Sequence, residues 1–115
     1  MNIRNEVNLI KDQIISWRRY FHENPELSFK EFNTAKKINS ELKSMGLKPK
    51  TKVGRTGVTV DLKFGEGPMI GFRADMDALP IQETSGLPFT SKNDGVMHAC
   101  GHDGHIAMLL GTAKI

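Results

Sequence analysis

The sequence of 115 residues contains a single cysteine, so it cannot form an internal disulfide. This excludes the small secreted class that disulfides hold together, and it leaves Cys100 as a candidate ligand or nucleophile. No apolar run is long enough to span a membrane, and residues 1–6 lack the apolar core of a signal peptide. We therefore expect a cytoplasmic protein without a membrane partner.

The chain also lacks blocks of like charge. Its formal net charge is +3, and its Lys and Arg residues are spread along the sequence without a run of five or six. We interpret them as solvated faces and expect no nucleic-acid partner. The 38% hydrophobic and 25% charged content is ordinary for a soluble chain, and the length suits one domain or part of one.

Hydrophobic periodicity predicts that the chain begins with two helices. Apolar residues recur at three- and four-residue steps over 3–22, which is typical of an amphipathic helix. A second helix is expected to begin at Ser28, because Ser28 and Glu31 form the S-x-x-E capping pattern. Gly46 is a suitable residue just past the end of this helix.

The pattern then changes to period two, which predicts strands and hence an α/β fold class. Residues 58–64 alternate as in a half-buried strand, and residues 69–74 are expected to pair with it antiparallel. A shorter strand is expected near 48–53. Residues 80–97 have the composition of a long, functional loop. Residues 106–115 are expected to be helical, and an end inside an apolar helix predicts that the sequence is truncated.

Four side chains with metal affinity lie within eight residues: His98, Cys100, His102 and His105. Thiolate and imidazole groups suit Zn²⁺ and its transition-metal neighbours. Asp103 could orient one of the imidazoles. The alternative is that these residues are solvated or packed, since the spacing matches no standard zinc finger.

A second group of polar residues follows the predicted strand 69–74. Asp75 and Asp77 lie two residues apart where that strand opens into the loop, and ends of strands are where sites collect in α/β proteins. Near a cation, these carboxylates could ligate the ion or orient a ligand. The alternative is an acidic pair that only caps the turn.

Two groups of polar residues on the first helix are expected to have structural roles rather than roles in a site. Arg18 and Arg19 are expected on a solvated face rather than in a substrate clamp. His22 is expected to interact with the last carbonyls of its helix.

Several motifs in one order resemble the aminoacylase/hippurate-hydrolase amidohydrolases, which include auxin-conjugate hydrolases and bacterial N-acyl-amino-acid deacylases. The resemblance covers nearly the whole chain, and order makes the set more specific than any one motif. The motifs are Arg18–Ser28 with Glu31–Phe32, Gly54–Val58, Phe72–Pro80, Gly86–Phe89 and Met97–His105.

The resemblance implies a zinc-exopeptidase type of catalytic domain, a three-layer α/β/α sandwich around a mixed sheet. It implies hydrolysis of N-acyl amino acids at two divalent ions (Zn, Mn, Co or Ni), and it allows a homodimer of the full-length protein. Cys100 and His102 match the family's metal ligands. Asp75 and Asp77 match an acidic motif in which related peptidases have His-x-Asp, so they are candidate catalytic residues whose separate roles are left open.

The same resemblance implies that residues 1–115 are the N-terminal part of the catalytic domain, without the lid or dimerisation domain and the C-terminal half. The family's general base, a Glu, and its further ligands lie downstream of the Cys/His run and match nothing here. We therefore expect this chain to be inactive alone. Two rival hypotheses remain: a non-catalytic metal-binding or interaction fragment, and a small structural zinc domain that unfolds on chelation.

Overall fold

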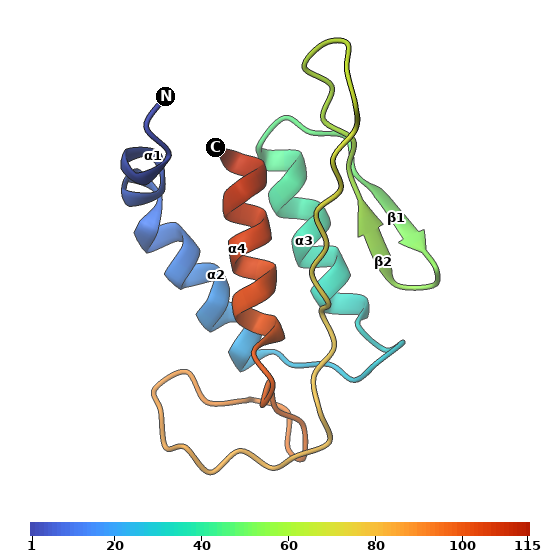
Figure 1. The fold of residues 1–115 in the computed structure, drawn as a ribbon. Coiled ribbons are helices and arrows are strands. Elements are labelled where there is room, and N and C mark those ends of the chain that lie inside the picture. Colours follow the sequence, from blue (N-terminus) through green and yellow to red (C-terminus); the bar gives the residue numbers. More distant parts are fainter.

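The computed structural model describes all residues, 1–115. It contains four helices and one small sheet: α1 (Ile3–Leu9), α2 (Lys11–Glu23), α3 (Phe32–Ser44), β1 (Lys50–Val53), β2 (Gly57–Thr59) and α4 (His102–Lys114). In Figure 1, α4 lies between α2 and α3, and the β1–β2 hairpin lies beside α3. α2 runs antiparallel to α4. No helix is long or apolar enough to cross a membrane.

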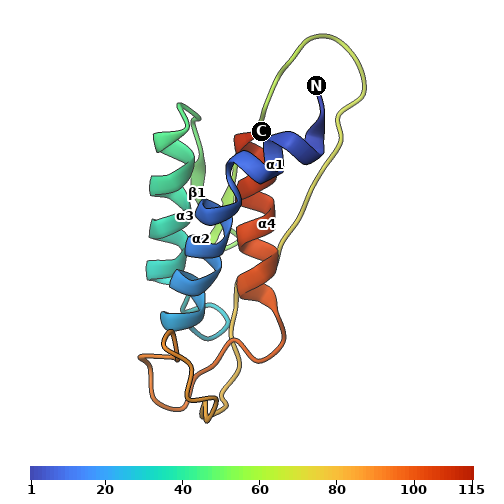
Figure 2. The ribbon, with the colours of Figure 1, turned by 90° about the vertical axis from the view of Figure 1, so that its left-hand side faces the viewer.

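The core lies where the apolar faces of α2, α3 and α4 meet. Its buried members are Trp17, Phe21, Leu42, Ile106, Ala107 and Leu110. Gly111 lets α2 and α4 approach closely, because a Cβ at this position would lie 3.0 Å from Ile14 Cδ1. The helices therefore form a framework that holds the N-terminal end of α4 against the C-terminal end of α2, as both Figure 1 and Figure 2 show.

The helix predicted over 3–22 is present but divided in two. Ile10 has φ −110° and ψ 10° and serves as the C-cap of α1 and the N-cap of α2. α1 buries no residue, whereas α2 buries Trp17 and Phe21. The core contacts of the predicted helix thus come from α2, and α1 lies outside the core.

The second helix begins four residues later than predicted, at Phe32, so the capping box at Ser28 was wrong. The carboxylate of Glu26 takes its place. It accepts hydrogen bonds from the backbone N–H of Asn33 at 3.2 Å and of Thr34 at 2.6 Å, which are two of the helix's free N-terminal donors. Ser28 is exposed and makes no comparable contact.

This difference can be tested by two alanine substitutions. Glu26→Ala should lower the free energy of unfolding by about 1–2 kcal/mol, because it leaves helix N–H donors unpaired. Ser28→Ala, the matched control, should change it by less than about 0.5 kcal/mol. Urea unfolding followed by circular dichroism measures both, and a larger loss for Ser28→Ala would show that the capping box operates after all.

The predicted strands form only in part. β1 confirms the short strand expected near 48–53, and it pairs antiparallel with β2, the first residues of the predicted strand 58–64. Residues 69–74 form no strand, so that prediction was wrong. Residues 60–76 instead leave the hairpin, turn back at 65–67 and then run along the molecule without strand pairing (Figures 1 and 2).

The reason is that a strand needs a partner as well as a suitable pattern. No backbone hydrogen bond links residues 60–76 to a neighbouring strand, and most of these residues are exposed. Four of their apolar side chains are strongly exposed, Phe64 93%, Met69 88%, Ile70 76% and Phe72 70%, whereas Val60 and Met76 pack against the core. Alternation predicted an extended backbone correctly, but it contains no information on which chain segment lies alongside.

Residues 80–97 form the long loop that was predicted. Its base is closed by an isolated antiparallel bridge between Leu79 and Met97. Its far side is tied to the end of α2, where the Lys92 N–H donates to the Glu23 carbonyl at 2.9 Å. The loop is therefore held against the same end of the helices at which α4 begins.

Candidate metal centre

Three of the sequence-predicted site residues come together at one end of the molecule. The first turn of α4 contributes His102, and the segment before the loop contributes Asp75 and Asp77. Gly101, directly before α4, has φ +106°, a left-handed conformation that glycine adopts without strain. This turn allows the extended stretch that carries Cys100 to enter the helix at His102.

His102 is held by Asp77. Its Nδ1 lies 3.0 Å from Asp77 Oδ1 and 2.9 Å from the Asp77 carbonyl oxygen. Both oxygens can only accept, so Nδ1 carries the proton and donates it. In the neutral ring the free electron pair then lies on Nε2. This is the arrangement in which a carboxylate fixes the tautomer and orientation of a metal-binding histidine.

Asp75 lies on the other side of the same ring. One of its carboxylate oxygens is 4.0 Å from His102 Nε2, and the other accepts from Arg73 Nη2 at 2.8 Å. The hydrogen bond and charge of Arg73 lower the pKa of the Asp75 carboxyl below its usual value. Asp75 is therefore an ionised carboxylate near the nitrogen of His102 that Asp77 leaves free.

The other members of the Cys/His run are spread apart. Cys100 is an exposed free thiol, and His105 is exposed one turn along α4, with its ring centroid 5.8 Å from that of His102. His98 is 3% exposed, and neither of its ring nitrogens has a hydrogen-bond partner. Burial, foremost, lowers the pKa of His98 to about 4.

The donor types present fit a transition-metal ion, but the set is incomplete. No three His, Cys, Asp or Glu side chains are grouped so that they could hold a metal ion. The structure therefore brings His102, Asp75 and Asp77 together, and it leaves Cys100 and His98 outside a formed ligand group. A complete centre would need donors beyond those already grouped here.

A buried ionic network beside this site was not anticipated. His22 is 3% exposed, and its Nδ1 lies 2.9 Å from Asp103 Oδ2 while its Nε2 lies 2.9 Å from Glu83 Oε2. Arg18 Nε contacts the same Asp103 oxygen at 2.9 Å. The expectations that His22 interacts with helix carbonyls and that Arg18 is merely solvated were therefore wrong. Asp103 orients the imidazole of His22, and not, as the sequence predicted, one of the imidazoles of the Cys/His run.

Glu83 fixes the loop end of the network. Its carboxylate accepts from the Ser91 N–H at 2.8 Å and also from the Ser85 hydroxyl. Burial would raise the pKa of Glu83, but hydrogen bonds from Ser85, His22 and the Ser91 amide outweigh it and lower the pKa to about 2. Glu83 is thus a carboxylate that joins the long loop to α2.

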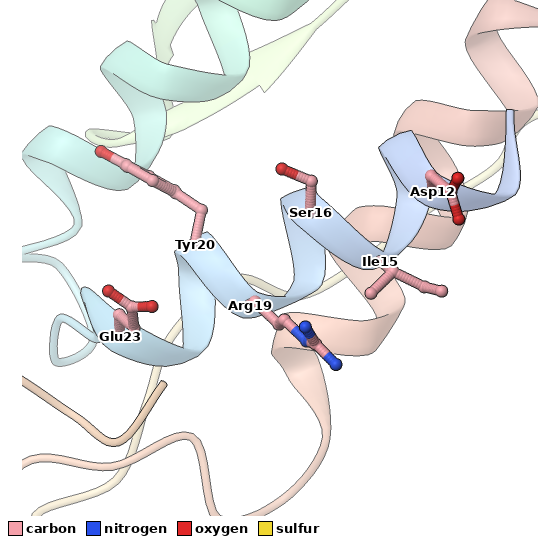
Figure 3. A pocket seen from close by; sticks show the side chains of 6 residues that line it. All are labelled: Asp12, Ile15, Ser16, Arg19, Tyr20 and Glu23. Carbon is pink, nitrogen blue, oxygen red and sulfur yellow. The ribbon is translucent and has the colours of Figure 1, made fainter. Parts of the chain in front are cut away.

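Two shallow hollows on the surface have none of Asp75, Asp77, Cys100 and His102 in their linings. One is formed by a single face of α2, with Asp12, Ile15, Ser16, Arg19, Tyr20 and Glu23 around it (Figure 3). Its side chains point outward from one helix, and none belongs to the His102 group. We therefore locate the candidate site by its side-chain contacts.

Comparisons with known proteins find relatives of this chain in one family. Residues 71–115 match the family described as Peptidase family M20/M25/M40. The chain is 51% identical over 115 residues to an N-acyl-L-amino acid amidohydrolase of Geobacillus stearothermophilus, covering 98% of this chain and 31% of the relative. The chain thus spans about a third of the length of this curated relative.

Solved structures resemble the fold as well as the sequence. Bacillus subtilis YxeP, described as a dinuclear metal-binding peptidase of the M20 family, is 49% identical with a TM-score of 0.88, over 93% of this chain and 30% of that one. A protein from methicillin-resistant Staphylococcus aureus is 44% identical with a TM-score of 0.92, over 99% of this chain and 31% of that one.

These matches confirm the family resemblance and the α/β fold class predicted from the sequence. Residues 71–115 match the M20 family, the curated relative is an amidohydrolase, and the helices and small antiparallel sheet match part of the fold of the two solved structures. A dinuclear metal-binding relative also supports divalent metal ions as the kind of cofactor to consider.

Proposed function

We propose that this chain supplies one corner of a metal-dependent amidohydrolase centre that acts on N-acyl amino acids. The observation that carries the proposal is the Asp77–His102 pair, which fixes the ring with Nε2 unprotonated. Cys100 and His102 are the proposed ligands to the ion. A substrate of the N-acyl amino acid class is supported by the printed name of the Geobacillus relative.

The two aspartates take different roles in this proposal. Asp77 is a positioning residue, because it contacts His102 Nδ1 and leaves Nε2 free. Asp75 lies near Nε2 and is held by Arg73, so it is placed to face a cation bound there. A divalent ion at Nε2, Zn²⁺ by donor type or Mn²⁺, Co²⁺ or Ni²⁺, would supply polarisation of the scissile carbonyl and activation of water.

Asp77→Asn tests this assignment. The asparagine amide can turn its N–H₂ toward Nδ1 and so disfavour the tautomer that leaves Nε2 free. We expect Zn²⁺ affinity to fall by about tenfold to a hundredfold. Isothermal titration calorimetry measures it. Asp61→Asn is the matched control, because Asp61 is exposed and has no side-chain partner, and equal affinities for the two variants would contradict the proposal.

The 115-residue chain is expected to be inactive by itself. The family resemblance assigns the general base and the remaining ligands to positions that match nothing in residues 1–115. The test is turnover of N-acetyl amino acids and hippurate with Zn²⁺, Mn²⁺ or Co²⁺ present. If the parent chain hydrolyses these substrates faster than a Cys100→Ala variant, the expectation is wrong.

The rival hypothesis, an interaction fragment, is favoured by one observation. Residues 60–76 expose apolar side chains on a backbone that makes no hydrogen bond to a neighbouring strand, which is the kind of edge that pairs with another chain. The two hypotheses differ in their dependence on metal. The amidohydrolase proposal requires that Asp77 and His102 substitutions weaken metal binding, whereas an interaction fragment that binds no metal does not; a non-catalytic metal-binding fragment shares this requirement and differs from the enzyme in turnover.

A further inference from the structure

We propose that His22 is a positioning residue for the metal-ligand turn: by bridging Asp103 and Glu83, it fixes the start of α4 and thereby the place of His102. This inference rests on the proposed function, because it takes His102 as a ligand. The observation behind it is the buried network of Arg18, His22, Asp103 and Glu83, to which the proposed chemistry assigns no role.

The first step is the geometry of the bridge. Both ring nitrogens of His22 face carboxylate oxygens at 2.9 Å, one of Asp103 and one of Glu83. Arg18 contacts the same Asp103 oxygen, so both buried carboxylates have polar partners, which is the condition under which buried charged groups are tolerated.

The second step is that this arrangement leaves His22 unavailable for chemistry. Each ring nitrogen is occupied by a carboxylate oxygen, so neither is open to a metal ion while the bridge is intact. Its ring is also packed edge-on against Phe89, with centroids 5.6 Å apart. His22 therefore acts by holding Asp103 and Glu83 in place.

The third step concerns the beginning of α4. Its N-cap is Gly101, which has no side chain and provides no capping hydrogen bond. His102 is the first residue of this helix, and helix ends without a cap fray. Asp103 is the next residue, and its carboxylate is tied to His22 and Arg18 on α2. These contacts of Asp103 restrain the first turn of α4, which has no side-chain cap.

The fourth step joins the loop to the same point. One carboxylate oxygen of Glu83 contacts His22 Nε2, and the other accepts from the Ser91 N–H. Residues 83–91 are thus anchored to α2 through the His22 ring. His102 is then positioned twice: its ring by Asp77, and its backbone by the Asp103–His22 contact. Loss of His22 should therefore move the ligand turn without removing any ligand.

The experiment compares Zn²⁺ dissociation constants of the full 115-residue chain, measured by competition with a chromophoric chelator. His22→Gln retains one donor and cannot bridge both carboxylates. We expect its Zn²⁺ affinity to be about tenfold to a hundredfold weaker than that of the parent chain. Each variant's stability is measured in parallel by urea unfolding.

The matched control is Glu31→Gln. Glu31 is 5% exposed and accepts a buried hydrogen bond from Thr56 Oγ1 at 2.7 Å, and neither residue belongs to α4 or to the His22 network. The amide of this variant can still accept from Thr56 but without the charge of the carboxylate, so its stability should fall while its Zn²⁺ affinity stays within about twofold. A purely structural role for His22 predicts that both variants behave alike.

The outcomes separate the two proposals. If the parent chain binds no Zn²⁺, the proposed function fails. If the parent binds and His22→Gln binds equally well, the positioning role of His22 is overturned. If His22→Gln does not fold, Arg18→Gln replaces it, since Arg18 is 41% exposed and contacts the same Asp103 oxygen as His22. Its affinity should fall by about threefold to tenfold, and unchanged affinity would likewise overturn the inference.

Discussion

Replacing His102 with alanine should weaken Zn²⁺ binding by at least about a hundredfold. The Nδ1–H of this ring is held by Asp77 and its Nε2 faces the ionised Asp75, so the substitution removes the only histidine arranged as a ligand. Residues that merely support a ligand already contribute tenfold to a hundredfold, and loss of the ligand itself should exceed that range. Isothermal titration calorimetry of the two chains measures the difference.

His105→Ala is the matched control. His105 lies one turn further along α4 and is exposed, and no carboxylate holds its ring. Its replacement should leave Zn²⁺ affinity within about threefold. If His105→Ala weakens Zn²⁺ binding more than His102→Ala does, then His105 is the ligand, and contact with Asp77 does not identify the metal-binding histidine.

Phe21→Ala should lower the free energy of unfolding by about 3–5 kcal/mol. Phe21 is 0% exposed at the centre of the contact between α2, α3 and α4, and its removal leaves a cavity that three packed helices cannot easily close. Because small domains are stable by only about 5–15 kcal/mol, this single change should shift the urea midpoint strongly. Circular dichroism during urea unfolding reports it.

The neighbouring Tyr20 provides the comparison. Tyr20 packs edge-on against Phe21 at 5.5 Å but is 37% exposed. Tyr20→Ala should therefore cost about 1 kcal/mol, much less than Phe21→Ala. Equal losses would show that the core is not centred on Phe21.

Local patterns predicted local structure well. The helical periodicity of α2 and α4 and the αL position at Gly46 (φ +82°) follow from interactions between residues a few positions apart, which the sequence contains directly. The start of α3 could not be predicted in this way, because the carboxylate that caps it belongs to Glu26, eight residues before Thr34. The same limitation applies to residues 69–74, whose pattern suits a strand but does not specify a partner.

The candidate site shows the same division. Cys100, His102, Asp75 and Asp77 could be selected because clustered donors next to strand and helix ends are a local signal. The bridge of His22 to Asp103 and Glu83 joins positions 81 and 61 residues apart. No spacing rule links such positions, and His22 alone looked like an ordinary helix-terminal histidine. The buried charges are visible only once the fold brings α2, the loop and α4 together.

The central claim is that Cys100 and His102 form one corner of a divalent-metal centre. The most direct measurement is a Co²⁺ titration of the 115-residue chain, followed by the thiolate-to-cobalt charge-transfer absorption, with Cys100→Ser measured alongside. The account predicts a saturable band in the parent chain that is absent from the variant, since only a cobalt–sulfur bond produces it. A parent spectrum indistinguishable from that of Cys100→Ser would contradict the claim.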